Sequence, residues 1–176
     1  MERIPGTSRS LTGPVTHETD RRTVLVGGGL ALLAGLAGCG SLPQGNAPAA
    51  GASASASDIL AGIRHANGLG SLSSDARLEQ AARQQAGYMA GAGRMSHTTG
   101  WGKDFAARVK DNGIEGAAAE NIAEGRMDLP RLFDMWMRSP PHRRNMLDAR
   151  FGHFGLAYAG GGKNGQWRYW ALVLGR

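Results

Sequence analysis

Three side chains in this sequence have the chemistry of a small metal or acid–base site: His97, Glu120 and His142. Two imidazoles and one carboxylate are ligands that Zn²⁺ accepts, and three protein ligands leave a fourth position for water or substrate. A zinc ion held in this way could activate water for hydrolysis. The three residues lie far apart in the sequence, so only the fold can bring them together.

Each of these residues also has a purely structural interpretation. His97 lies between a helix end and a glycine-containing turn, where its ring would bond loop backbone. Glu120 would form an ion pair with an arginine. His142 follows two prolines and would cap the short turn that contains Asn145. The residues alone leave both interpretations open.

The first 38 residues have the pattern of an export signal. Arg21 and Arg22 precede an apolar run over residues 23–38, which is shorter than the roughly 20 residues that cross a bilayer. The run ends in Leu-Ala-Gly-Cys at 36–39, which resembles a bacterial lipobox, in which Cys39 is lipidated and becomes the new N-terminus. We predict a twin-arginine lipoprotein signal over residues 1–38. Ordinary export and an unmodified cysteine are the alternatives.

Composition limits the partners. The formal net charge is +6, and this surplus favours anionic surfaces such as lipid headgroups or cell-wall polymers. The basic residues are spread through the chain without a stripe or motif, so we expect no nucleic-acid binding. A single cysteine excludes an internal disulfide framework, and the domain must be held by packing alone.

Residues 39–56 are rich in Gly, Ala, Ser and Pro and are predicted to form a flexible tether. Residues 57–176 have the pattern of one α+β domain. Apolar residues at helical spacing predict helices that begin at Ser57, at Ser74 or Asp75, and near residues 102 and 129. Residues 118–123 suit a strand, and alternation around the turn at 160–165 predicts a hairpin. Helices followed by a hairpin indicate an antiparallel sheet that is covered by helices.

The tryptophans allow two interpretations. They could form an apolar groove for lipid or glycan, or they could serve ordinary packing, which we favour. The residues concerned are Trp101, Trp136, Trp167 and Trp170.

Four segments, taken in order, resemble the CAP superfamily of cysteine-rich secretory, antigen 5 and pathogenesis-related-1 proteins in its bacterial form. They are residues 78–90, Ser-His-Thr-Thr-Gly at 96–100, Ala-Glu-Asn-Ile-Ala-Glu-Gly at 119–125, and Trp-Met-Arg-Ser-Pro-Pro-His-Arg-Arg-Asn-Met-Leu at 136–147. Residues 151–157 and 167–170 follow in the family's order. The resemblance covers residues 57–176 and implies an α–β–α sandwich with a cleft.

The resemblance also implies which residues line that cleft. His97 and His142 match the family's two histidines, and Glu120 matches one of its two acidic residues. Ser139 stands where many members carry the second acidic residue, so the four-residue set is incomplete here. Zn²⁺ is the metal that the set would take. Asn121 and Asn145 are expected to bond backbone and to fix the segments that carry Glu120 and His142.

These observations favour an exported, membrane-anchored monomer that binds a lipid, cell-wall or protein ligand without catalysis. Its expected location is the periplasm or the cell exterior. Gly40 after the cysteine resembles the outer-membrane sorting signal of Gram-negative lipoproteins. The alternatives are a zinc-dependent hydrolase of envelope material and a stable interaction scaffold. Nothing in the sequence separates the binding module from the scaffold.

Overall fold

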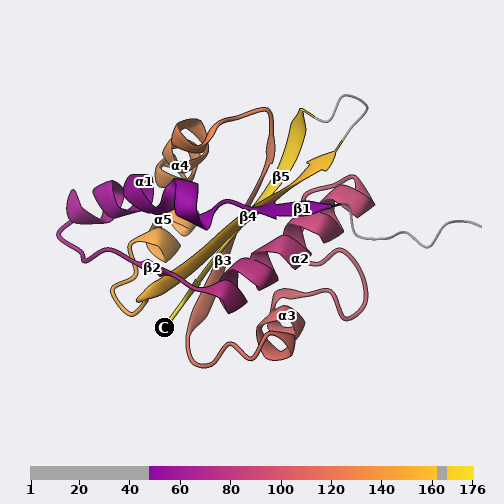
Figure 1. The fold of residues 1–176 in the computed structure, drawn as a ribbon, viewed down its shortest axis with the longest axis horizontal. Coiled ribbons are helices and arrows are strands. Elements are labelled where there is room, and N and C mark those ends of the chain that lie inside the picture. The colour runs from indigo at the N-terminus through magenta and orange to yellow at the C-terminus, as the bar shows by residue number, and fades with distance from the viewer. Residues whose placement is uncertain (1–47, 162–165) are drawn as a thin grey trace, which may run out of the picture. The chain divides into compact units, whose positions relative to one another are not determined.

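The computed structural model describes residues 48–161 and 166–176 (Figure 1). Cys39 and the signal predicted over residues 1–38 lie outside these ranges. Within them, no helix is long and apolar enough to cross a bilayer. The described elements, in chain order, are β1 (Ala49–Gly51), α1 (Ser53–His65), β2 (Ser73–Ser74), α2 (Ala76–Ala92), α3 (Phe105–Asp111), β3 (Ala118–Gly125), α4 (Leu129–Arg138), α5 (Pro140–Met146), β4 (His153–Gly161) and β5 (Trp167–Gly175).

One sheet runs through the middle of the domain. Its order is β1-β4-β5-β3, and β2 pairs with the start of β4 in parallel. The other neighbours are antiparallel: β4 and β5 form the hairpin that alternation predicted, and β3 pairs with β5 over its whole length. The α+β class with an antiparallel sheet is confirmed. Along this path β3 lies at an edge of the sheet, so Glu120 has a neighbouring strand on one side only.

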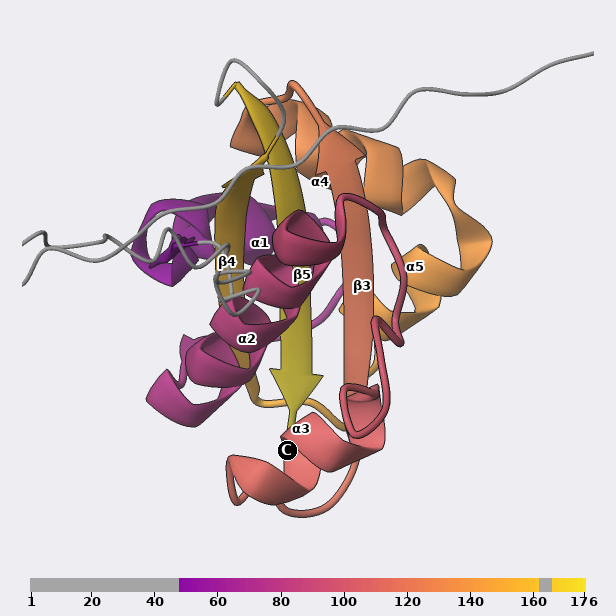
Figure 2. The ribbon, with the colours of Figure 1, turned by 90° about the vertical axis from the view of Figure 1, so that its right-hand side faces the viewer.

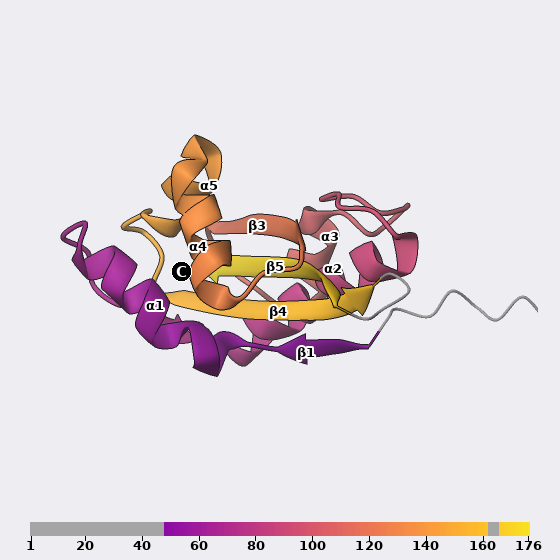
Figure 3. The same cartoon turned by 90° about the horizontal axis from the view of Figure 1, so that it is seen from above.

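Helices cover both faces of the sheet, so the domain is an α–β–α sandwich. In Figure 2, α2 and α3 lie in front of the sheet while α1 and α4 lie behind it, and Figure 3 shows the layers from above. Successive residues of a strand point to opposite faces. Accordingly, β5 directs Tyr169, Ala171 and Val173 toward the α2 side and Trp170, Leu172 and Leu174 toward α1 and α4.

The folded domain begins earlier than the sequence predicted. Residues 49–56, expected in the tether, form β1 and the start of α1. Ser57, expected to begin the helix, lies inside it, and its hydroxyl donates to the Ser53 carbonyl (3.0 Å). Glu79 of α2 accepts from the Ser53 N–H (3.2 Å), and a Cβ at Gly51 would collide with the Glu79 carboxylate. Small residues here therefore reflect close packing against α2.

Aspartate side chains mark three helix starts by accepting backbone N–H bonds from the first turn. Asp75 caps α2, Asp104 caps α3 and Asp128 caps α4. The cap at Asp104 explains why α3 begins after the predicted residue 102.

The Pro140-Pro141 pair has two effects. Helix α4 ends at Arg138, as a proline two residues later predicts. The same pair then opens α5, because proline fits the first helical position, where the missing N–H would have no partner. Only a short turn was predicted here, whereas the structure has a helix, α5, which carries His142.

Gly155 in β4 and Gly62 in α1 form a matched pair for testing the packing. A Cβ at Gly155 would overlap the backbone of Leu78 and Glu79, whereas one at Gly62 meets nothing within 4 Å. We expect Gly155→Ala to lower the free energy of unfolding by about 3 kcal/mol. Gly62→Ala should raise it by up to about 1 kcal/mol. Urea unfolding measures both, and a Gly155→Ala variant as stable as the wild type would contradict the close approach of α2 to β4.

Candidate functional site

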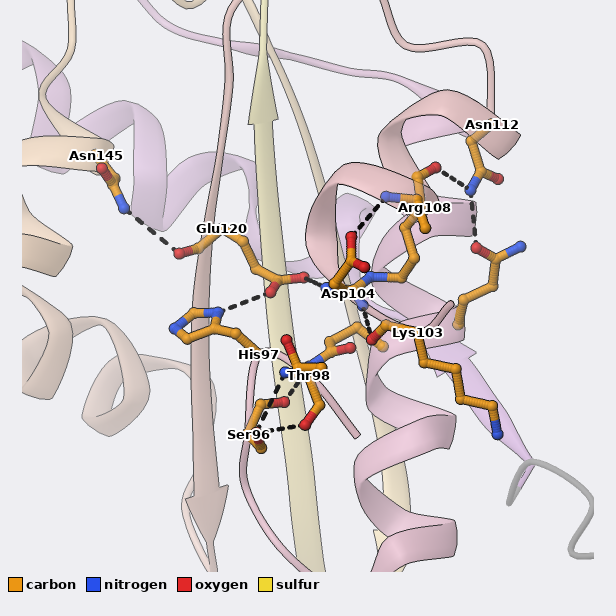
Figure 4. Close-up of polar contacts among 12 residues, drawn as sticks. Ser96, His97, Thr98, Lys103, Asp104, Arg108, Asn112, Glu120 and Asn145 are labelled. Atoms are coloured by element: carbon orange, nitrogen blue, oxygen red, sulfur yellow. Dashed lines mark hydrogen bonds and ion pairs between the residues drawn. The ribbon is translucent and has the colours of Figure 1, made fainter. Parts of the chain in front are cut away.

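The centre of the candidate site is the Glu120 carboxylate, which is 7% exposed on the edge strand β3. Its Oε2 accepts from Nη2 of Arg108 (2.6 Å), and its Oε1 accepts from Nδ1 of His97 (2.8 Å) (Figure 4). A carboxylate out of water is costly unless it is paired and hydrogen-bonded. Both oxygens are thus engaged, one of them by a permanent cation.

Arg108 is the functional residue that sequence reasoning missed. It lies on α3, is 1% exposed, and donates from Nη1 to the Lys103 carbonyl (2.9 Å). Its Nε has no hydrogen-bond partner among the described residues. Phe105, three residues earlier, lies on the same side of α3, and the Arg108 guanidinium carbon is 5.9 Å from the centre of its ring. That spacing was the available signal for a buried arginine, and Glu120 was its partner.

His97 comes from the loop between α2 and α3. Its side chain is 55% exposed, and because Nδ1 is bound to Glu120, Nε2 is left for a ligand or solvent. The loop is held by Gln85, a buried residue of α2 whose Nε2 donates to the Ser96 carbonyl (2.6 Å). The Ser96 hydroxyl also donates to the Thr98 carbonyl (2.7 Å). His97 is therefore positioned by a carboxylate rather than by loop backbone.

His142 lies near the start of α5 and within electrostatic range of His97. Burial lowers the pKa of His142 below its usual value, and electrostatic repulsion from the nearby His97 lowers that pKa further. Two asparagines join α5 to β3: Asn121 donates to the His142 carbonyl (3.1 Å), and Asn145 donates to Asn121 Oδ1 (2.8 Å). Asn145 also reaches the Glu120 carbonyl (3.4 Å). The asparagines thus hold the segments that carry Glu120 and His142.

A groove of about 200 Å³ lies beside His142 along the free edge of β3. Its lining comes from three places: the strand, the α4–α5 region and the α2–α3 loop. The residues are Met95, Ile122, Ala123, Glu124, Met135, Ser139 and His142. Ser139 makes no side-chain cap bond to α5, so its hydroxyl is available to a ligand.

The four tryptophans do not share one groove. Trp136 and Trp170 are at most 1% exposed and belong to the core between the sheet and α4, whereas Trp101 is fully exposed and Trp167 is 39% exposed. The Nε1 of Trp136 donates to the Ile122 carbonyl at the edge of β3 (3.1 Å). Ordinary packing, the interpretation favoured above, therefore describes two of them.

The zinc set predicted from the resemblance does not fit the geometry around Glu120. In the described parts of the chain, no three His, Cys, Asp or Glu side chains are arranged to hold a metal ion. Glu120 would have to give up Arg108 or His97 to become a ligand, and His97 already uses Nδ1. As arranged, Glu120 positions His97, and His142 is held through its backbone by Asn121.

Comparison with known proteins defines the family. Residues 58–174 match the family model described as "CAP: Cysteine-rich secretory protein family". This match spans more than half of the chain. The chain therefore belongs to the CAP, or cysteine-rich secretory protein, family.

Individual relatives are distant. The uncharacterized protein YkwD of Bacillus subtilis (strain 168) is 33% identical over 101 residues, which are 56% of this chain and 39% of YkwD. The chain thus spans well under half the length of that curated relative. An outer surface protein from Borrelia burgdorferi is 20% identical, with a TM-score of 0.60 over 68% of this chain and 87% of that one. An extracellular SCP-domain protein from Bacillus anthracis str. Ames is 22% identical, with a TM-score of 0.61 over 70% and 39%. Both structures share the fold.

The Arg108–Glu120 pair makes a stability prediction. Arg108→Met leaves a buried carboxylate without its cation, and we expect the free energy of unfolding to fall by about 3–5 kcal/mol. The double variant Arg108→Met/Glu120→Leu removes both charges and should recover most of the loss. Chemical denaturation measures all three proteins. If the double variant were as unstable as the single one, the unpaired carboxylate would not be the main cause of the lost free energy of unfolding.

A calorimetric titration with Zn²⁺ tests the metal interpretation. Because Glu120 is committed to Arg108 and His97, we expect binding weaker than micromolar and without a fixed stoichiometry. His97→Ala/His142→Ala is the control, with its fold checked by circular dichroism. Stoichiometric micromolar binding by the wild type that disappears in the folded double variant would restore the zinc set.

Proposed function

We propose that this chain is an exported lipoprotein, anchored through Cys39, whose CAP domain binds an envelope ligand in the groove beside His142 without turnover. The observation that carries the binding part is the engagement of both Glu120 oxygens by Arg108 and His97. That carboxylate serves to orient His97. The Nε2 of this imidazole is then available to form a hydrogen bond with a ligand.

The groove beside His142, which is within electrostatic range of His97, has the composition of a ligand site. Such sites are mainly apolar, with a few convergent polar groups that set the orientation of the ligand. Met95 and Met135 supply exposed apolar contact, while Ser139 and His142 supply polar atoms in the same groove. The lowered pKa of His142 keeps its ring neutral near pH 7, so it can donate one hydrogen bond and accept another.

The same geometry argues against a hydrolase. Nucleophilic catalysis needs a nucleophile hydrogen-bonded to a base. Among the described residues, no hydrogen bond joins the Ser139 hydroxyl to a histidine, and Ser139 replaces the second acidic group that the resemblance implied. Arg108 neutralises the remaining carboxylate of the set. A binding role uses these residues as they stand.

Export and anchoring are supported by residues outside the described ranges and by the named relatives. Arg21, Arg22 and the apolar run precede Cys39. Since β1 begins at Ala49, the intervening segment reaches about 30 Å at full extension, which would keep the domain near a membrane. The Borrelia burgdorferi relative is named an outer surface protein and the Bacillus anthracis relative an extracellular one.

Fractionation and sedimentation test the two parts of this proposal separately. The full chain should collect in the membrane fraction, and Cys39→Ser should release it, because acyl chains hold the protein to the bilayer. In the Cys39→Ser background, we expect isolated cell envelopes to retain the protein. Retention should fall in His97→Ala/His142→Ala and persist in His65→Ala, a control that alters an exposed histidine of α1.

Two outcomes would contradict the proposal. Equal retention of all three proteins would show that the groove does not bind. Soluble fragments released from the envelopes by the wild type, but not by the double variant, would establish turnover instead.

A further inference from the structure

We infer that the groove beside β3 takes an extended peptide segment, which pairs with the free edge of the strand at Ile122 and Glu124. The inference rests on the binding function proposed for this groove and names the chemical class of its ligand. Three observations carry it: the direction of the backbone groups of β3, the absence of proline, lysine and bulges from the strand, and the two walls of the groove.

The register shows which backbone groups of β3 face outward. Ala117 and Arg176 lie opposite each other, and the Arg176 N–H donates to the Ala117 carbonyl (3.2 Å). Hydrogen-bonded pairs alternate along an antiparallel ladder. The N–H and C=O of Glu120, Ile122 and Glu124 therefore point away from β5. Side-chain bonds from Asn145 to the Glu120 carbonyl and from Trp136 to the Ile122 carbonyl agree with this direction.

Several of these outward groups remain unfilled. Among the described residues, no hydrogen-bond partner is found for the outward N–H of Ile122. The same holds for the outward N–H and C=O of Glu124. The Ile122 carbonyl has a second lone pair beyond the one used by Trp136. Outward groups repeat every two residues, or about 6.8 Å along a strand. An extended polypeptide backbone offers matching donors and acceptors at that spacing, as in β-strand addition.

The sequence of the edge carries no blocking residue. Natural proteins protect exposed edges with proline, lysine or bulges, or cover them with a helix or loop. β3 reads Ala-Ala-Glu-Asn-Ile-Ala-Glu-Gly, without proline or lysine, and its register with β5 is continuous. Side chains of α4 and α5 already bond to the carbonyls of Ile122 and Glu120, and the groove reaches the strand at residues 122–124, where a further strand can pair.

Two walls flank the edge and select side chains. Met95 of the α2–α3 loop forms one wall, and Met135, Ser139 and His142 form the other. A strand laid beside β3 would send alternate side chains to these walls, where methionine adapts to different apolar shapes. Glu124 forms none of the ion pairs of the described residues, so a lysine or arginine of the peptide would complement it.

A peptide fits these features better than the other two ligand classes. A lipid chain has no donors or acceptors for the open N–H groups of the edge. Glycan hydroxyl groups can bond to them but do not repeat at strand spacing. We therefore commit to an extended segment with apolar residues at alternate positions and a basic residue opposite Glu124.

The test uses random heptapeptides displayed on phage and selected on the full chain carrying Cys39→Ser. Enriched peptides are then synthesised and their affinity is measured by fluorescence polarisation. Glu124→Pro removes one open N–H at a position where proline is tolerated, because that group takes no part in the ladder. We expect it to weaken binding about tenfold. Glu124→Gln keeps the N–H and should weaken only the basic peptides.

The inference is overturned if no peptide is enriched, or if the enriched peptides bind Glu124→Pro as they bind the wild type. If Glu124→Pro does not fold, amide hydrogen exchange in the wild-type protein tests the inference instead. The peptide should slow exchange of the Ile122 and Glu124 amides, and unchanged exchange overturns the inference. If no peptide is enriched but protease-treated envelopes still retain the protein, the ligand is a glycan or a lipid. The proposed binding function would then stand without the peptide inference. If no peptide is enriched and the envelopes do not retain the protein either, both the proposed binding function and the peptide inference are contradicted.

Discussion

The cost of burying one carboxylate organises this end of the domain. Glu120 is almost out of water on an edge strand, and a charged group there needs partners. Arg108 can supply the charge only if α3 packs against that face of the sheet, and the Asp104 cap sets where α3 begins. His97 fills the remaining oxygen and so fixes the loop before α3. Helix, loop and strand are therefore joined through one carboxylate.

The residue after Glu120 extends this organisation to the other layer. Because neighbours on a strand face opposite sides, Glu120 turns toward α3 while Asn121 turns toward α5. Asn121 holds the carbonyl of His142, and Asn145 of α5 holds Asn121 in return. Two consecutive residues of β3 therefore connect both helical layers. This is how His97 and His142, from segments far apart in the chain, come within electrostatic range of each other.

Periodic patterns predicted the elements that show one buried side or clean alternation. The start of helix α4 was predicted near residue 129, because Leu132, Phe133 and Trp136 form one apolar stripe. β1 was missed because three small residues have no period, and their size reflects packing against Glu79. Arg108 was missed for a different reason. A buried arginine is recognisable only with its partner, and Glu120 lies twelve residues away on another element.

Shape limits what can pair with the free edge of β3. Pairing with the edge of another folded sheet would bring helical layers along on both sides of that sheet. Those layers would meet Met95 and the α2–α3 loop on one side and Met135 and α5 on the other. A single extended segment has no such layers and can lie between the walls. The elements that build the cleft therefore also restrict which strand can reach it, so that shape does here what lysine or proline does on other edges.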